Sequence, residues 1–94
     1  VDQAQLRDAL VSYYADERFV HVLPQGLQPN LARVAGTNAV EVQVVCDEHA
    51  GLAVVTSAID NLCKGSSGGA LQALNVALGI DEGAGLSQLM PALP

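Results

Sequence analysis

The sequence is poor in aromatic residues and in positive charge. Only Tyr13, Tyr14 and Phe19 are aromatic among 94 residues, so a core has to be built from Val, Leu, Ile and Ala. Four Lys and Arg residues stand against ten Asp and Glu, for a net charge of −6, and no basic patch is interleaved with aromatic residues. Binding to nucleic acid or to an anionic membrane surface is therefore disfavoured.

Long apolar runs and metal-binding spacings are missing as well. The apolar runs are far shorter than the ~20 residues of a membrane span, and no signal peptide opens the chain. Cys46 and Cys63 form no CxxC pair, and with only His21 and His49 beside them no zinc-ligand spacing is present. We therefore expect a cytoplasmic protein with no metal site and with two free thiols.

The chain is also low in charge of either sign. Charged residues make up 15 % of it, against roughly 25 % in typical soluble domains. A chain of this length forms one domain, near the lower end of what buries an adequate core. Such a chain exposes apolar surface, which indicates that it packs against another domain or subunit.

Hydrophobic periodicity predicts an α+β fold. Apolar residues at helical spacing indicate an amphipathic N-terminal helix over residues 3–15, and Asp2 begins its capping box. A short strand is expected at 19–23. The segment 24–36 is rich in turn residues and reads as a loop, in which Arg33 is expected to be solvated.

A long antiparallel β-hairpin follows. Val residues alternate with Glu41 and Gln43 and so predict a half-buried strand over residues 38–46. Residues 47–51 form the hairpin loop. The return strand, 52–59, is more continuously apolar, which is typical of a central strand covered on both faces.

The last predicted helix, residues 66–78, is apolar nearly all round. Leu71, Leu74 and Leu78 form one stripe, and Ala and Val fill most of the remaining surface. A helix of this kind is buried on more than one side. Two helices and three strands can hardly cover it, so this C-terminal buried helix predicts a partner outside the chain.

The rest of the chain is organised around the connection between the return strand and this helix. It carries the only lysine, Lys64, among Gly and Ser residues whose backbone N–H groups would be free at the helix N-terminus. Such a terminus suits an anion or a polar edge of a cofactor, although a well-capped strand-to-helix turn explains the same residues. The order of a phosphate-binding loop is absent, because Gly65 follows the lysine where Ser or Thr should stand.

This connection also carries a family resemblance. The matching residues are Asp60-Asn61-Leu62-Cys63-Lys64-Gly65, Gly69-Ala70, Asn75, Gly79 and Asp81-Glu82-Gly83-Ala84-Gly85-Leu86, with Tyr14, Phe19-Val20, Val22-Leu23-Pro24 and Gly36-Thr37-Asn38 upstream. Over residues 14–86 the chain resembles the C-terminal end of N-acetyl-gamma-glutamyl-phosphate reductase. Members are several times longer. The resemblance implies part of the second domain of a glyceraldehyde-3-phosphate-dehydrogenase-like two-domain reductase, with segment 57–80 packed on a missing dinucleotide-binding domain.

The resemblance further implies an oxidoreductase that uses NADPH to reduce an acyl phosphate to N-acetylglutamate semialdehyde in arginine biosynthesis. Neither Cys46 nor Cys63 lies in the family's Gly-Cys-aromatic-Pro-Thr context, and neither His21 nor His49 lies in its His-Arg-His-Thr-Pro-like run. No GxGxxG fingerprint is present. No catalytic residue is therefore expected within these 94 residues, and the chain alone should be inactive.

The resemblance places the segment around Asn61 near the nicotinamide half of the cofactor. On that basis Asn61, Lys64 and Gly65 are the candidate cofactor-binding residues: an amide partner, a positive charge and a close backbone approach. The expected partners are the missing N-terminal portion, further copies in a homo-oligomer and a small-molecule substrate. The alternative is a non-catalytic oligomerisation or interaction module derived from the same family.

Overall fold

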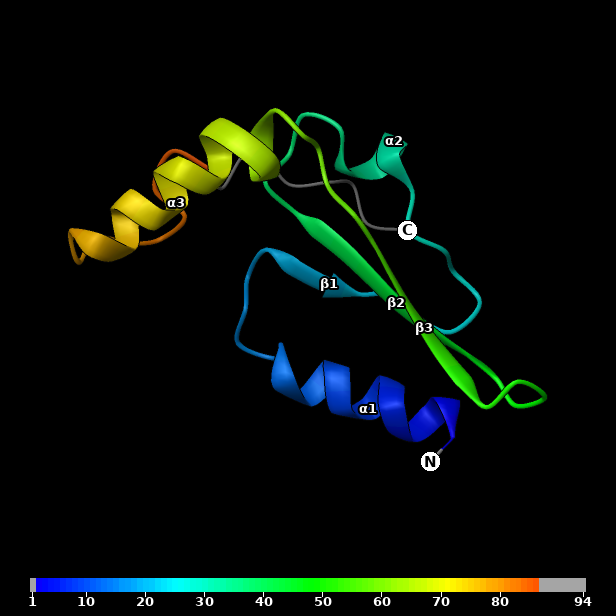
Figure 1. Cartoon of the computed structure of the whole chain (residues 1–94). Helices are drawn as coiled ribbons and strands as arrows, with labels where there is room; N and C mark the ends of the chain where they lie inside the picture. The colour runs from blue at the N-terminus through cyan, green and yellow to red at the C-terminus, as the bar shows by residue number, and fades with distance from the viewer. Residues whose placement is uncertain (1, 87–94) are drawn as a thin grey trace.

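The computed structural model describes residues 2–86, which form a three-stranded sheet with helices (Figure 1). In chain order the elements are α1 (Gln3–Tyr13), β1 (Val20–Val22), α2 (Leu31–Val34), β2 (Val40–Asp47), β3 (Leu52–Ala58), the π-helical turn η1 (Cys63–Ser67) and α3 (Gly68–Ala77). We call residues 2–58 the sheet body and residues 59–86 the arm. The expected α+β fold is confirmed at this level.

Helix α1 begins with the predicted capping box. The Asp2 carboxylate accepts a hydrogen bond from the Gln5 N–H at 2.8 Å, and the Gln5 side chain accepts one from the Asp2 N–H at 2.9 Å. The Arg7 guanidinium donates twice to the Leu23 carbonyl, at 2.8 and 3.0 Å. These bonds hold α1 along one face of the sheet, with its N-terminus at the hairpin end (Figure 1).

The sheet has the order β1-β2-β3. Strand β1 pairs with β2 in parallel, with Val20 opposite Val40, and β2 pairs with β3 as the predicted antiparallel hairpin. The prediction of a central return strand is wrong, because β3 lies at an edge with Val54 and Val55 more than half exposed. The apolar run reflects a need for cover that residues 2–86 do not supply.

Strand β2 is covered on both faces, which corrects the prediction of a half-buried strand. Glu41 is 0 % exposed and Gln43 is 3 % exposed. The connection from β1 to β2, which contains the unpredicted short helix α2, folds over these two side chains. The Gln43 amide donates to the carbonyls of Pro24 and Leu27, at 2.9 and 2.8 Å. Alternation gives the period of a strand but not which faces are covered.

Arg33 is not solvated as expected but holds this connection to the sheet. Its guanidinium donates to both carboxylate oxygens of Glu41, at 2.7 and 3.0 Å, and the Asn30 N–H donates to the same carboxylate at 2.9 Å. Burial on its own raises the pKa of Glu41, but the hydrogen bonds from Arg33 and Asn30 and the Arg33 charge outweigh it, so the pKa lies below its ordinary value.

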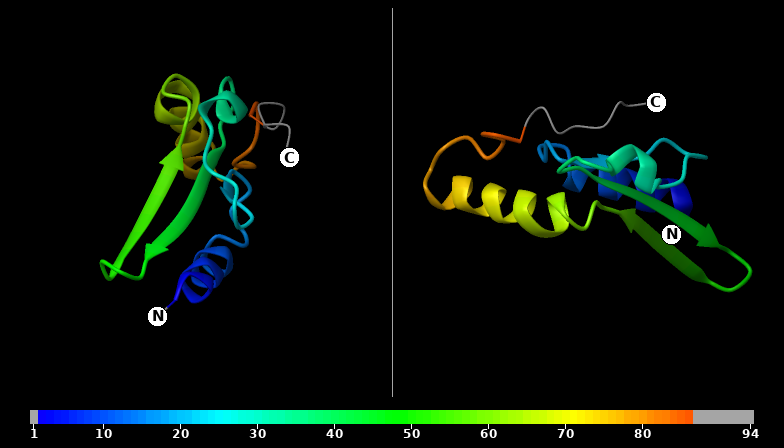
Figure 2. Two further views of the ribbon diagram at one scale, coloured as in Figure 1. Left: turned by 90° about the vertical axis from the view of Figure 1, so that its right-hand side faces the viewer. Right: turned by 90° about the horizontal axis from the view of Figure 1, so that it is seen from above.

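The arm extends away from the sheet body (Figures 1 and 2). The molecule measures 46 × 26 × 21 Å with a radius of gyration of 14.5 Å, against about 12 Å for a compact chain of this length. In α3 only Gly68 and Asn75 are buried, while Leu74 and Val76 are 52 % and 62 % exposed. The expected buried helix is therefore not buried by residues 2–86. Within these residues, no helix combines the length and the apolar character needed to cross a membrane.

Candidate functional site

The turn between β3 and α3 is organised by Asp60. Its carboxylate accepts hydrogen bonds from the Gly36 N–H at 2.6 Å, from the Leu62 N–H at 2.7 Å and from the Cys63 N–H at 3.3 Å. The bonds from Gly36 and Leu62 lower the pKa of Asp60 most, and Cys63 adds to the effect. The anion expected at this helix start is thus an aspartate of the chain itself, which argues against a separate anion-binding loop.

The helix begins three residues earlier than predicted, in a π-helical turn. The Gly65 N–H donates to the Asp60 carbonyl at 3.0 Å and the Ser67 N–H donates to the Leu62 carbonyl at 3.2 Å, each across five residues. This wider turn brings the backbone of α3 against the sheet body. A Cβ on Gly68 would collide with the Asn38 side chain and would lie 2.7 Å from the Cys63 carbonyl oxygen.

A chain of polar side chains connects this turn to the sheet body. The Gln72 carbonyl oxygen accepts from Lys64 Nζ at 2.7 Å and from the Asn38 amide at 2.9 Å, while its amide donates to Glu82 at 2.9 Å. Lys64 Nζ also lies 5.8 Å from the centre of the Phe19 ring. The only lysine of the chain is therefore directed inward, toward the junction of body and arm.

The three candidate cofactor-binding residues lie together in this turn but differ in access. Asn61 is exposed, and its amide makes no hydrogen bond to the part of the chain that the structure describes. Gly65 is also exposed, and a Cβ there would lie 3.3 Å from the end of the Ile59 side chain. Lys64 is half-buried and bound to Gln72. The Asn61 side chain and the Gly65 backbone are therefore accessible from outside, although the Gly65 N–H is bonded to Asp60, whereas Lys64 is held by Gln72.

Sequence reasoning missed Asn38, Gln72 and Glu82 as members of this site. Asn38 is 0 % exposed at the entry to β2, and its partner Gln72 is 34 residues further along the chain. Asn38 and Glu82 do belong to the segments that carry the family resemblance, and Gln72 is a polar residue in an apolar helix, but none of these signals pairs the three residues with one another. Which residues would meet it depends on how the arm folds back on the sheet body.

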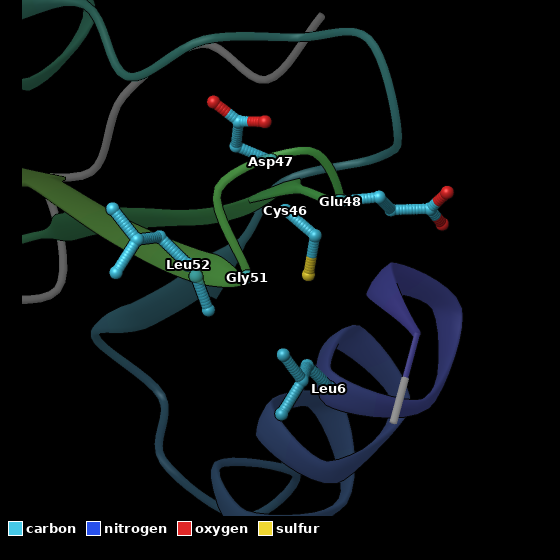
Figure 3. Close-up of a pocket in the computed structure, with 7 residues that line it drawn as sticks. Leu6, Cys46, Asp47, Glu48, Gly51 and Leu52 are labelled. Atoms are coloured by element: carbon cyan, nitrogen blue, oxygen red, sulfur yellow. The ribbon is translucent and has the colours of Figure 1, made fainter.

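The cysteines do not form a second site. Cys46 and Cys63 are free thiols, as expected, and residues 2–86 contain no group of three side chains able to hold a metal ion. A pocket at the hairpin end is lined by Cys46, Asp47 and Glu48 (Figure 3). There the Cys46 sulfur points toward Leu6, while both carboxylates point away from it.

Comparison with known proteins places the chain in a family. Residues 1–61 match a family model described as "Semialdehyde dehydrogenase, dimerisation domain". This range runs from α1 through β3 and ends just before η1, so it covers the whole sheet body and the first three residues of the arm. The chain therefore belongs to the semialdehyde dehydrogenase family, in the part that this description calls a dimerisation domain.

The most informative relatives are more particular. The chain is 52 % identical over 89 residues to the N-acetyl-gamma-glutamyl-phosphate reductase of Corynebacterium glutamicum, covering 95 % of this chain and 26 % of the relative. The enzymes of the same name from Paenarthrobacter aurescens and Streptomyces coelicolor are each 51 % identical, over 93 % and 95 % of the chain and 25 % and 26 % of the relatives. The resemblance seen in the sequence is confirmed, and the chain spans about a quarter of the length of these relatives.

Proposed function

We propose that the chain acts as the C-terminal portion of an NADPH-dependent N-acetyl-gamma-glutamyl-phosphate reductase. In this reaction an acyl phosphate is reduced to N-acetylglutamate semialdehyde, a step of arginine biosynthesis in the cytoplasm. The observation that carries the proposal is the exposed apolar helix α3, which extends from the candidate cofactor turn without cover from residues 2–86. The similarity to reductases about four times as long supports it.

The two regions have separate roles in this proposal. The sheet body, which matches the dimerisation-domain description, supplies contacts between subunits. The arm, within segment 57–80, packs on the dinucleotide-binding domain of a glyceraldehyde-3-phosphate-dehydrogenase-like reductase. The side chains available for that contact are Leu71, Leu74, Val76 and Leu78, exposed by 37 % to 65 %.

NADPH, held mainly by the N-terminal portion, supplies the hydride. Asn61 offers its free amide to the nicotinamide half, and Gly65 allows the close approach of its backbone. Together these residues form one wall of the cofactor site, and Lys64 places its positive charge near phosphate or the substrate carboxylates when its bond to Gln72 opens. Cys46 and Cys63 take no part in catalysis. The nucleophilic cysteine and the proton-transferring histidine belong to the missing portion, so the 94 residues alone are inactive.

The test is reconstitution with the missing N-terminal portion, followed by NADPH oxidation that depends on the acyl phosphate. We expect activity from the mixture and none from either part. Leu74→Gln should lower the reconstituted activity, because it places an amide in the contact with the nucleotide domain. Leu31→Gln is the matched control, since Leu31 is a similarly exposed leucine in α2. A folded pair without activity would contradict the proposal.

The alternative function is a non-catalytic oligomerisation module. The match of residues 1–61 to a dimerisation domain favours it, because that range lies outside the candidate cofactor turn except at Asp60 and Asn61. Light scattering and NADPH titration separate the two proposals. A stable oligomer that does not bind NADPH, even with the N-terminal portion present, would favour the module.

A further inference from the structure

The outer edge of β3 has free hydrogen-bonding groups. In β2, the Val40 N–H donates to the Phe19 carbonyl and the Val42 carbonyl accepts from the Leu23 N–H. The backbone N–H and C=O groups of the even-numbered residues of β2 therefore point toward β1. The odd-numbered ones therefore point toward β3. With the observed register, Leu52, Val54, Thr56 and Ala58 of β3 face β2. The N–H and C=O groups of Ala53, Val55 and Ser57 face outward, and no residue in 2–86 bonds to them.

Strand β3 does not have the features of a natural edge. Exposed edge strands usually carry charged residues, especially Lys, or a proline, and these block pairing with another strand. The sequence of β3 is Leu-Ala-Val-Val-Thr-Ser-Ala, with no charge and no proline, and it lies antiparallel to β2 over seven residues. Leu52, Val54 and Val55 are 54 % to 61 % exposed on the two faces. This composition is that of an internal strand.

The face of the sheet that α1 covers also continues beyond the helix. An apolar groove of about 340 Å³ lies between α1 and β3, and it is lined by Leu6, Ala9, Leu10, Tyr13, Val44, Ala53 and Val55. The β3 side of this face is therefore open next to the free edge of the strand. An added strand would extend this face next to the groove.

The chain direction fixes how such a strand would run. Helix α1 begins at the hairpin end, where the Gln3 side chain accepts from the Cys46 N–H at 2.9 Å, and it runs back toward the start of β1 (Figure 1). A strand leading directly into α1 would end at the hairpin end. It would therefore run parallel to β1 and antiparallel to β3, as in a strand–helix–strand unit.

The handedness of that unit selects the edge. In Figure 1, α1 lies below the sheet. The turned views of Figure 2 show that β3 lies in front of β2 in the view of Figure 1, so the sheet order β1-β2-β3 places β1 behind β2. A strand beyond β3, followed by α1 and β1, makes a right-handed crossover, whereas a strand beyond β1 makes a left-handed one. About 98 % of such crossovers are right-handed. The connection from β1 through α2 to β2, on the opposite face, follows the same rule.

We propose that the outer edge of β3 binds a β-strand from the segment that directly precedes residue 1 in the complete reductase. The strand runs antiparallel to β3, and the sheet order becomes β1, β2, β3 and then the added strand. This inference rests on the proposed function only in taking the chain as part of a longer reductase. It accounts for the internal-strand composition of β3, which lies at an edge only within residues 2–86.

Site-resolved hydrogen exchange on the complete reductase tests the inference without using its activity. The inward amides of Val54 and Thr56 are the internal reference. We expect the outward amides of Ala53, Val55 and Ser57 to exchange within about tenfold of that reference, because all five would be bonded within one sheet. Fast exchange of the outward amides beside slow inward ones would overturn the proposal, even in an enzyme that reduces its substrate.

A proline pair identifies the occupant of the edge. Val55→Pro removes an outward N–H and should lower the Tm of the complete reductase, whereas Leu31→Pro, at the first position of α2, should be tolerated. Light scattering should show an unchanged number of subunits for Val55→Pro. A smaller oligomer would show that the edge binds a second copy of the chain. A Tm equal to that of Leu31→Pro would show that the edge is unpaired. Either result would overturn the proposal.

Discussion

The sheet body and the arm of this molecule satisfy their side chains in opposite ways. In the body, even polar residues are enclosed: Glu41 and Gln43 are buried under a loop whose backbone and Arg33 satisfy them. In the arm, apolar residues such as Leu74 and Val76 remain exposed. The contrast is sharpest between β2, whose polar side chains are enclosed by the body's own contacts, and α3, whose apolar side chains residues 2–86 leave uncovered.

The largest effect should come from the buried ion pair of the body. Glu41→Gln removes the charge that Arg33 pairs with and should destabilise the chain by about 3 kcal/mol, the lower end of the range for breaking a buried pair. The lower end applies because the Arg33 side chain is 20 % exposed. Urea unfolding measures the change.

The matched control is the ion pair that joins body and arm. Arg18 Nη2 and Asp81 Oδ1 lie 2.8 Å apart, but the two side chains are 44 % and 61 % exposed. Asp81→Asn should therefore have only a small effect, because solvent screens an exposed pair. If Asp81→Asn proved as costly as Glu41→Gln, the contrast between the buried pair within the body and the exposed pair at its junction with the arm would be wrong.

A smaller effect is expected where the arm meets the body. Gly68→Ala should destabilise the chain by about 2 kcal/mol, because its Cβ has no room against Asn38 and the Cys63 carbonyl. Gly65→Ala, in the same turn, is the control. Its nearest contact is the flexible end of Ile59 at 3.3 Å, and alanine favours a helix over glycine, so stability should be unchanged or slightly higher. Thermal unfolding compares them, and equal losses would show that the junction is not closely packed.

These two regions also differ in how well the sequence predicts them. The capping box at Asp2, the hairpin and the apolar C-terminal helix follow from local patterns, and each is present. The π-helical turn has no such pattern, and the residue that it places Gly68 against, Asn38, lies thirty residues earlier in the chain. The Arg33–Glu41 pair was missed for the same reason, because a loop and a strand must first be brought together.

The candidate site divides in the same way. Residues Asp60 to Gly65 form a contiguous motif in the sequence, and this motif carries the resemblance to the family. The motif alone does not predict that the Asp60 carboxylate accepts from the backbone at the start of the helix, or that Lys64 points inward to Gln72. The position of Asn61 in the turn follows from the sequence, but residues 2–86 place no further side chain around its exposed amide that would define a ligand.

The smallest expected effect concerns Asp60, which bonds to the body at Gly36 and to the arm at Leu62 and Cys63. Because these bonds lower its pKa in the folded state, its contribution to stability is fully present above the unfolded pKa, near 3.9. It is lost as the pH falls through the lower, folded pKa.

Asp60→Asn should therefore be less stable than wild type at pH 7, and the difference should shrink below about pH 4. Urea unfolding at both pH values measures it. The stabilising contributions of Glu41 and Asp81 are also lost at low pH, because their pKa values are lowered too. Both residues are present in wild type and variant, so their contributions cancel in the difference. A difference that stayed constant with pH would mean that Asp60 joins the two regions by its shape alone and not by its charge.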